Sequence, residues 1–466
     1  MTEIAERLRA ALGAEAVRSE PEALARHARD SWVLSELRDL EGETFRADAV
    51  VEPADTEQVA AVLRLCRETR TAIVPYGGGS GVCGGVLAPA GAVVLSTRRM
   101  EGLVALDDGD LLASFRAGTN GMAAERRVQE AGLTIGHWPQ SIELSTVGGW
   151  VATRAAGQLS TAYGNVEDLL FALEAVLPDG TVVRTRATPR ASAGPDLRQI
   201  FLGSEGTLGV VTEATFSLRP KPEASRGQAC HFADLQTGLE AIRRLMRAGH
   251  RPPVVRLYDA HESKRSFESY CPEGRALLLL LHEGPAAQVE LEMRGVAGLC
   301  GDLGGESSDP KVVDEWLDHR NQVPGFRGFL ERGIVLDTIE VGATWSRVGE
   351  VYRRVTESLR EVAGILVASG HSSHSYRSGT NLYFTFAARP AERARMAETY
   401  RECWRRTMEA TLAAGGGIAH HHGIGRVRRA ALAGEIGAGG VALLRALKRA
   451  LDPDGLLNPG VLLPDA

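Results

Sequence analysis

The chain has 466 residues, of which 44% are hydrophobic and 24% are charged, and its formal net charge is −6. This length is sufficient for roughly two or three domains, each with a core of its own. The negative charge argues against nucleic acid as a main partner, and the 6 cysteines, which form no C-x-x-C pair, exclude a disulfide framework and a zinc ribbon.

The amino-terminal segment, residues 1–45, shows helical periodicity interrupted by charge. Residues 1–8 form the start of an amphipathic helix and do not resemble a signal peptide. No apolar run reaches the roughly 18 residues of a membrane span. We therefore expect a cytoplasmic protein.

The next segment predicts a strand at 49–53, a helix that opens at 55–58 and a buried strand at 71–74. The last strand runs into a turn with almost no side chains, residues 77–85. Glycine allows consecutive backbone N–H groups to point the same way, which forms a concave site for an anion such as phosphate. The turn therefore predicts a phosphate site, with a loose surface hairpin loop as the alternative.

Two common nucleotide motifs do not explain this turn. Gly79, Gly81 and Gly84 match the letters G-x-G-x-x-G, but the dinucleotide fingerprint needs a helix next, and residues 86–95 are broken by proline and glycine. A Walker loop would end in Gly-Lys-Ser/Thr, which this turn lacks. A nicotinamide site and a Walker site are both rejected.

Two more loops of small residues follow, at 140–154 and 203–212, after a predicted strand at 111–116, a helix at 121–131 and a short strand at 132–135. Each loop offers hydroxyl groups and backbone donors beside an apolar run, although glycine-rich turns are common between strands. Three such loops can enclose one extended ligand with a phosphate end and a flat apolar end. Together they favour a flavin dinucleotide over a mononucleotide.

The composition changes after Pro222. Strand-like runs at 275–282, 333–341 and 381–387 are separated by helical segments at 235–248, 286–300, 345–363 and 391–414. This pattern predicts an α+β substrate domain with an antiparallel sheet over 223–415. The chain then returns to the preceding domain in 416–466, where proline and glycine stop a helix at 446–451.

Three further segments carry a resemblance to a known family: residues 136–155, residues 163–168 and the run His-His-His-Gly-Ile-Gly at 420–425. The sequence resembles the flavoproteins of the vanillyl-alcohol oxidase and p-cresol methylhydroxylase superfamily. Within it, the alkyldihydroxyacetonephosphate synthase (alkylglycerone-phosphate synthase) family is more similar than the D-lactate and glycolate dehydrogenases. The run Gly-Ser-Glu-Gly-Thr-Leu-Gly at 203–209 is shared by the whole superfamily. The similarity extends from about residue 46 to the C-terminus.

The resemblance implies an α+β fold, with a two-part FAD-binding domain of the p-cresol methylhydroxylase type at 46–222, completed by 416–466, and an α+β substrate (cap) domain at 223–415. It implies FAD as the cofactor, held without a covalent bond because the glycine turn lacks the histidine that carries this bond in several relatives. The flavin contacts of the family fall on Pro75, Tyr76, Gly77, Gly78, Gly79, Ser80, Gly81, Gln140, Ser141, Ile142, Glu143, Leu144, Ser145, Thr146, Thr153, Arg154, Ala155, Ala156, Glu205, Gly206, Thr207, Leu208, Gly209, Val210 and Val211.

The resemblance also implies an activity, the exchange of the acyl chain of acyl-dihydroxyacetone phosphate for a fatty alcohol through a flavin N5 adduct, in ether lipid biosynthesis. His371 stands where the synthase usually has a substrate-binding arginine, and a histidine is a weaker and pH-dependent partner for phosphate. The other functional residues of the family fall on Tyr383, His137, His420, His421, His422 and Arg256.

This exchange needs a base that takes a proton from the carbon next to a ketone, and a donor that stabilises the resulting negative oxygen. Tyr383 can be the base only if its neighbours lower its pKa from the usual value of about 10, for which nearby histidines are the natural means. Plainer alternatives stay open. An alternating antiparallel strand would also carry Tyr383, and His137 can have a capping role beside a proline.

The histidine run could also bind a metal. Alternate side chains of an extended segment face opposite ways, so at most His420 and His422 can point to one centre, with a third ligand from His371 or His374. We predict no metal and favour stabilisation of an oxyanion or phosphate.

The main alternative activity is that of an FAD-linked oxidoreductase, which oxidises a D-2-hydroxy acid or related alcohol with an external electron acceptor; a flavin-binding protein without turnover is a third. Metal-using dehydrogenases of the superfamily show Gly-His-x-Gly-Asp-Gly-Asn, whereas no acidic residue follows His371 here. Residues 326–332 could touch a lipid or a membrane surface, but an ordinary half-buried helix is the expected structure. A homodimer is left open.

Overall fold

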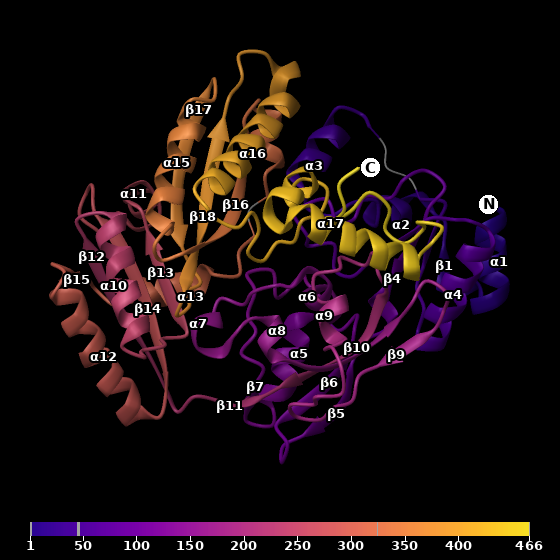
Figure 1. Cartoon of the computed structure of the whole chain (residues 1–466), viewed down its shortest axis with the longest axis horizontal. Coiled ribbons are helices and arrows are strands. Elements are labelled where there is room, and N and C mark those ends of the chain that lie inside the picture. Colours follow the sequence, from indigo (N-terminus) through magenta and orange to yellow (C-terminus); the bar gives the residue numbers. More distant parts are fainter. Residues whose placement is uncertain (1, 44–46, 324, 466) are drawn as a thin grey trace.

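The computed structural model describes residues 2–43, 47–323 and 325–465 (Figure 1). Within these residues the strands form four sheets, with four, five, two and seven strands.

The first sheet has the order β1-β2-β4-β3, in which β2, β4 and β3 are parallel and β1 is antiparallel to β2. Helix α4 begins near its predicted start because the Asp55 side chain accepts the N–H of Gln58 at 2.8 Å. The glycine turn leaves the carboxyl end of β3. The elements of this part are α1 (Glu3–Leu12), β1 (Val17–Arg18), α2 (Pro21–Arg26), α3 (Val33–Leu40), β2 (Ala49–Val51), α4 (Thr56–Glu68), β3 (Ile73–Tyr76) and β4 (Val93–Ser96), with 3-10 helices at Ala14–Ala16 and Thr97–Arg99.

The second sheet is antiparallel, with the order β5-β6-β10-β8-β9. The loop at 140–146 leads into α6, and the loop at 203–209 leads into β10. Its elements are β5 (Leu103–Asp107), β6 (Leu112–Arg116), α5 (Gly121–Gln129), α6 (Val147–Thr153), α7 (Ser160–Tyr163), α8 (Val166–Leu169), β8 (Leu170–Val176), β9 (Val182–Arg184), α9 (Arg198–Phe201) and β10 (Val210–Ser217), and a separate pair joins β7 (Leu133–Thr134) to β11 (Arg219–Pro220).

The seven-stranded sheet has the order β15-β12-β14-β13-β17-β18-β16, and all of its pairs are antiparallel. This confirms the predicted antiparallel sheet. Its elements are β12 (Ala224–Phe232), α10 (Leu235–Arg247), β13 (Val254–Tyr258), α11 (Ala260–Phe267), β14 (Ala276–Gly284), α12 (Ala286–Gly301), β15 (Glu306–Ser307), α13 (Lys311–His319), α14 (Arg327–Glu331), β16 (Val335–Thr344), α15 (Val348–Arg360), β17 (Ile365–Ser372), β18 (Gly379–Ala388) and α16 (Met396–Ala413), with a 3-10 helix at Arg393–Arg395.

The register of this sheet places four polar residues in one row. Tyr258 of β13 lies opposite His371 of β17, and His371 lies opposite Tyr383 of β18. Tyr383 in turn lies opposite Glu340 of β16. Directly opposite residues in antiparallel strands share a face of the sheet, so these four side chains stand on the same face.

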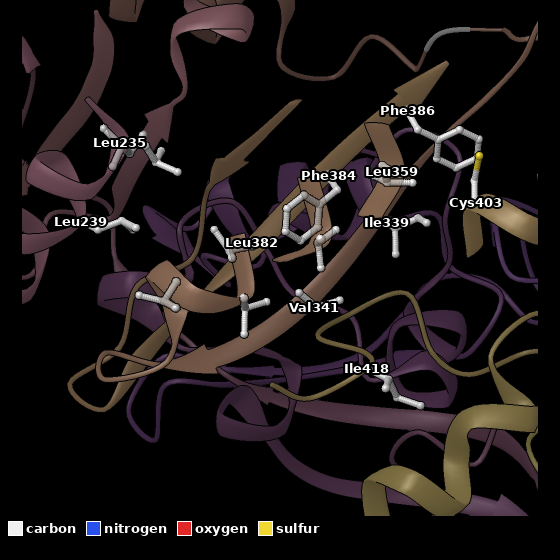
Figure 2. Packing of buried hydrophobic residues seen from close by; sticks show 14 of the residues in the cluster. Leu235, Leu239, Ile339, Val341, Leu359, Leu382, Phe384, Phe386, Cys403 and Ile418 are labelled. Atoms are coloured by element: carbon white, nitrogen blue, oxygen red, sulfur yellow. The ribbon is translucent and has the colours of Figure 1, made fainter. Parts of the chain in front are cut away.

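The opposite face of the sheet carries the largest hydrophobic core, which includes residues of α10, α15 and α16 (Figure 2). Leu382, Phe384 and Phe386 of β18 are fully buried in it. Because side chains alternate along a strand, Tyr383 and Thr385 point away from this core.

The C-terminal segment returns to the first sheet. The N–H of Ile73 donates to the carbonyl oxygen of Leu456 at 2.8 Å, and the N–H of Asn458 donates to that of Ile73 at 2.7 Å. Before it lie a 3-10 helix (Arg429–Ala431) and α17 (Leu432–Leu451). The segment Arg429–Leu451 is long and apolar enough to cross a membrane by length and composition, but a single helix of this kind is weak support for a span. Its helix is also interrupted at Gly437, where φ is +72°.

Candidate active site

A cavity of about 1030 Å³ lies between the three small-residue loops and the polar face of the seven-stranded sheet. Its size is that of a large ligand site. From the predicted flavin loops it is lined by Pro75, Tyr76, Gly77, Gly78, Gly79, Ser80, Gly81, Gln140, Ser141, Leu144, Ser145, Thr146, Thr153, Ala155, Ala156, Glu205, Gly206, Gly209, Val210 and Val211.

Five predicted flavin residues do not line this cavity: Ile142, Glu143, Arg154, Thr207 and Leu208. Ile142 and Leu208 are buried apolar side chains. Arg154 ends α6 with a φ of +55°, and its side chain pairs with Glu167 at 3.5 Å. The prediction covered whole stretches of chain, and within a stretch some side chains face away from the ligand side.

The glycine turn carries free backbone donors. In the described part of the chain, no acceptor receives the N–H groups of Gly78 to Gly81. Gly79 has a φ of +70°, and a Cβ atom on Gly78 would lie 2.0 Å from the carbonyl oxygen of Leu144. Glycine is therefore needed for the two loops to meet, and the free N–H groups form an anion site. This turn fits the pyrophosphate of FAD.

Glu205 joins the third loop to the segment that follows the histidine run. Its carboxylate accepts the N–H of Ile424 at 2.7 Å and that of Gly425 at 2.8 Å. Burial raises the pKa of Glu205 to about 7, although these two donors act in the opposite direction. The carboxyl group thus changes its charge near neutral pH.

Tyr383 lines the cavity from β18. Its hydroxyl oxygen accepts a hydrogen bond from the Thr338 hydroxyl at 3.0 Å, so its own proton is free to be donated. Burial raises the pKa of Tyr383 to about 12. The histidines nearby therefore do not lower its pKa, contrary to the condition under which Tyr383 could act as a base, because several of them are buried and hold no charge.

His371 lies beside Tyr383, with the two rings stacked 4.9 Å apart. Its Nδ1 is 2.6 Å from a carboxylate oxygen of Glu262, and its Nε2 is 2.9 Å from the guanidinium of Arg256. Glu262, in α11, was not among the predicted site residues. Its one sequence signal is Asp259, three positions earlier, which accepts the N–H of Glu262 as the cap of that helix.

Two arginines flank the indole of Trp316 in the cavity wall. The guanidinium carbon of Arg256 lies 5.3 Å from the ring centroid, and that of Arg320 lies 5.9 Å from it. Among the described residues, neither guanidinium has a carboxylate partner. Burial lowers the pKa of Arg320 only to about 10, so it is cationic at neutral pH. Arg320, which sequence reasoning missed, and Arg256 thus present two positive charges to the cavity and can bind an anion.

The histidine run is held in place by Glu340. A carboxylate oxygen of Glu340 accepts the N–H groups of His421 and His422, at 3.1 and 2.5 Å. His421 and His422 line the cavity, whereas His420 does not. His420 instead bonds through Nε2 to the Tyr376 hydroxyl at 2.7 Å.

The expected pairing of His420 with His422 at one centre is wrong, because this glycine-rich segment is irregular and not extended. One ligand atom each from His374, His420 and His421 lies within 4.8 Å of the others. His420 and His421 approach through their Nδ1 atoms at 2.8 Å, which is a hydrogen bond, and the rings of His374 and His420 are stacked. Burial lowers the pKa of all three, so they are neutral imidazoles at pH 7.

His137 lies outside the cavity. Its ring is fully buried and packs edge-on against Trp150 at 4.6 Å. Neither ring nitrogen has a partner in the described part of the chain, and burial lowers the pKa of His137 to about 3. The structure therefore does not bring His137 to the other predicted catalytic residues, and it shows no capping bond from its ring.

Two family descriptions match the chain. Residues 47–186 match the family described as "FAD binding domain". Residues 221–462 match the family described as "FAD linked oxidases, C-terminal domain".

Similar proteins carry several activities in their names. "Uncharacterized FAD-linked oxidoreductase YgcU" of Escherichia coli (strain K12) is 34% identical over 434 residues, which are 89% of each chain. "Alkyldihydroxyacetonephosphate synthase" of Trypanosoma brucei brucei is 29% identical, over 90% of this chain and 73% of the relative. "Glycolate oxidase subunit GlcD" of Bacillus subtilis (strain 168) is 27% identical, over 89% of this chain and 88% of the relative.

Two solved structures show the same fold. A structure of alkyldihydroxyacetonephosphate synthase has a TM-score of 0.80 at 24% identity and covers 98% of this chain and 84% of its own. A structure of p-cresol methylhydroxylase with substrate bound has a TM-score of 0.78 at 19% identity, with 98% and 96% covered. The two-part p-cresol methylhydroxylase type of fold is thereby confirmed, and the chain belongs to the FAD-linked oxidases, enzymes whose cofactor is FAD.

Proposed function

We propose that the protein is a transferase of the alkylglycerone-phosphate synthase type, which exchanges the acyl chain of acyl-dihydroxyacetone phosphate for a fatty alcohol. The observation that carries this proposal is that Arg256 and Arg320, two guanidinium groups without a carboxylate partner among the described residues, line one cavity together with His371 and Tyr383. The arginines suit a phosphate, and the other two side chains suit the proton transfer that a neighbouring ketone requires. The similarity to a synthase named for this substrate class adds support.

The proposed lipid chain also has a suitable place. Leu144 and Val323 line the cavity and yet are 51% and 46% exposed, so apolar side chains stand at its mouth. An aliphatic chain can leave the cavity there while the polar end of the substrate stays inside. FAD, when bound, supplies the centre at which electrons or the exchanging group are accepted.

A second candidate is an oxidoreductase that acts on a D-2-hydroxy acid or related alcohol. It is favoured by exposed charged and polar side chains in the cavity lining, among them Arg265, Glu315 and His319. These side chains suit a small hydroxy acid better than an aliphatic chain. Its carboxylate would use the same two arginines.

The flavin spectrum of the purified yellow protein separates the two. Under anaerobic conditions the transferase predicts that acyl-dihydroxyacetone phosphate and a long-chain alcohol are consumed, and that the visible flavin band is present in full once the substrate is exhausted, without any electron acceptor. Bleaching by a D-2-hydroxy acid, followed by recovery when a quinone-like dye is added, would instead support the oxidoreductase and contradict the transferase.

A further inference from the structure

We propose that His371, oriented by Glu262, is the base that takes the proton from the substrate, and that Tyr383 is the donor to the substrate oxygen. This inference rests on the proposed function only in requiring an anionic substrate with a carbonyl or hydroxyl group. It assigns a proton acceptor and a positioning carboxylate, Glu262.

The first support is the way in which two elements bring the pair together. One carboxylate oxygen of Asp259 accepts the N–H of Glu262 at 2.8 Å, and the other accepts the N–H of Gly370 at 2.6 Å. Asp259 therefore ties the first turn of α11 to the residue just before His371. The two backbone segments that carry Glu262 and His371 are thus held next to each other by the Asp259 carboxylate.

The second support is the full set of partners of Glu262. This carboxylate is 2% exposed. Its Oε2 faces His371 at 2.6 Å. Its Oε1 accepts from the hydroxyl groups of Ser369 at 3.2 Å and Thr385 at 2.8 Å and lies 3.3 Å from the guanidinium of Arg265. A buried carboxylate with this many donors accepts the Nδ1–H of the imidazole, which leaves the lone pair of the ring on Nε2. Nε2 is the nitrogen on the Arg256 side of the ring.

The charges near His371 favour a neutral ring that can take a proton. Burial lowers the pKa of His371, Glu262 and Asp259 raise it, and Arg256 lowers it. Burial alone would raise the pKa of Glu262, but His371 and Arg265 hold it at about 2. Because the ionised Glu262 carboxylate contacts the neutral imidazole, the positive charge that forms when the ring takes a proton is stabilised. Tyr258 and Tyr383, which pack on either side of the ring, keep their protons because burial raises the pKa of both.

The proposed step balances within the site. Arg256 moves from Nε2 to the anionic group of the substrate, which frees the lone pair. The C–H bond next to the substrate carbonyl breaks, its proton forms an N–H bond at Nε2, and the electron pair moves to the carbonyl oxygen. The Tyr383 hydroxyl donates to that oxygen while Glu262 neutralises the imidazolium. For an alcohol substrate, the hydroxyl proton takes the same path to Nε2.

The test compares His371→Gln, Glu262→Gln and Tyr383→Phe in the FAD-loaded protein. Exchange with D2O of the protons on the carbon next to the carbonyl of acyl-dihydroxyacetone phosphate is followed by mass spectrometry, and the oxidation of a D-2-hydroxy acid is followed if that is what the wild type converts. We expect a loss of about 10²- to 10⁴-fold for His371→Gln. Glu262→Gln removes the carboxylate that raises the pKa of His371, so the acidic limb of the kcat/KM profile moves to lower pH.

A second readout needs no turnover. The imidazole ¹⁵N resonances of the holoprotein, with the His371 signal identified by its loss in His371→Gln, report the pH at which this ring titrates. Glu262→Gln should lower that pH, and Tyr383→Phe should leave it near its wild-type value. The matched control is Glu292→Gln, which removes another carboxylate–histidine contact, the half-buried Glu292 to His282 at 2.8 Å, outside the cavity lining. It should leave both the titration of His371 and the kinetics as they are.

Three results would overturn the inference: His371→Gln within threefold of the wild type, no shift of the His371 titration in Glu262→Gln, or a rate that depends on a single alkaline ionisation lost in Tyr383→Phe. Failure of the proposed function looks different, because ether would be absent while His371 still titrates as expected and a hydroxy acid is oxidised through it.

Discussion

Glu340 and Arg428 form an ion pair in which both side chains have no exposed surface. The pair stands behind the histidine run, since Glu340 also accepts the N–H groups of His421 and His422. Arg428 donates to the carbonyl oxygen of Gly423 at 2.6 Å, at the end of the same run. A buried charge without a partner would destabilise the fold, but here the two charges neutralise each other. The pair holds His421 and His422, the only adjacent histidines that line the described cavity.

Removal of one partner of the Glu340–Arg428 ion pair should lower the stability of the protein. Arg428→Met leaves Glu340 charged and without its ion-pair partner, and we expect a loss of about 3–5 kcal/mol in the free energy of unfolding. Denaturant unfolding followed by circular dichroism measures it. Arg353→Met, which removes an exposed pair with Glu350 and Glu357 on α15, should cost less than about 1 kcal/mol. Equal losses in the two variants would contradict this account of Arg428.

The glycine turn should not tolerate a side chain at its centre. The Cβ of Gly78→Ala would lie 2.0 Å from the Leu144 carbonyl, so the two loops must separate, at a cost of about 1–3 kcal/mol. We expect a lower FAD content, measured as the ratio of visible to ultraviolet absorbance of the purified protein. Gly298→Ala in α12, where a Cβ meets nothing within 4 Å, should retain full FAD content. A fully yellow Gly78→Ala protein would count against the turn as the pyrophosphate site.

Arg320 should contribute to substrate affinity more than to the chemical step. In Arg320→Met the substrate anion loses a charge-assisted contact, so KM should rise by about 10- to 100-fold while kcat changes less. Arg320→Lys should restore part of the affinity. Steady-state kinetics at low and high salt measure both effects, and the wild type should weaken more with salt than Arg320→Met. An unchanged KM in Arg320→Met would show that the anion binds elsewhere.

Glu205 should make stability depend on pH near neutrality. Its pKa of about 7 in the folded protein lies above the unfolded value of about 4.3, so the folded state binds the proton more tightly. This contribution is present at low pH and is lost as the pH rises through about 7. Between pH 5.5 and 7.5 it amounts to about 2 kcal/mol, and Glu205→Gln should remove it. Unfolding at the two pH values tests this, and an equal pH dependence in both proteins would contradict the assignment.

Local patterns were sufficient for much of the fold. The alternation in β18 and the apolar spacing of α10 are visible in the sequence, and the three glycine loops led to FAD, which the family confirms. The antiparallel sheet follows from the same patterns. The domain boundaries and the catalytic roles stay predictions.

The site itself depends on pairings that local patterns do not contain. His371 meets Tyr258 and Tyr383 only through the register of three strands, and register is set by the whole sheet. Glu262 meets His371 because α11 packs beside β17, and the sequence shows only the helix cap. His137 was placed in the site by its position in a segment that resembles the family. That position does not say which way its ring points, and the ring lies outside the cavity. The irregular His420–His422 run shows why a rule for extended strands fails in a glycine-rich segment.

The most direct test of the proposed activity is a product assay without an electron acceptor. The purified yellow protein is incubated anaerobically with acyl-dihydroxyacetone phosphate and a long-chain alcohol, and ether product and released fatty acid are measured by mass spectrometry. The transferase predicts the two products in equal amounts over many turnovers. No ether and no fatty acid, together with dye reduction by a hydroxy acid, would contradict the transferase and leave an oxidoreductase built on the same site.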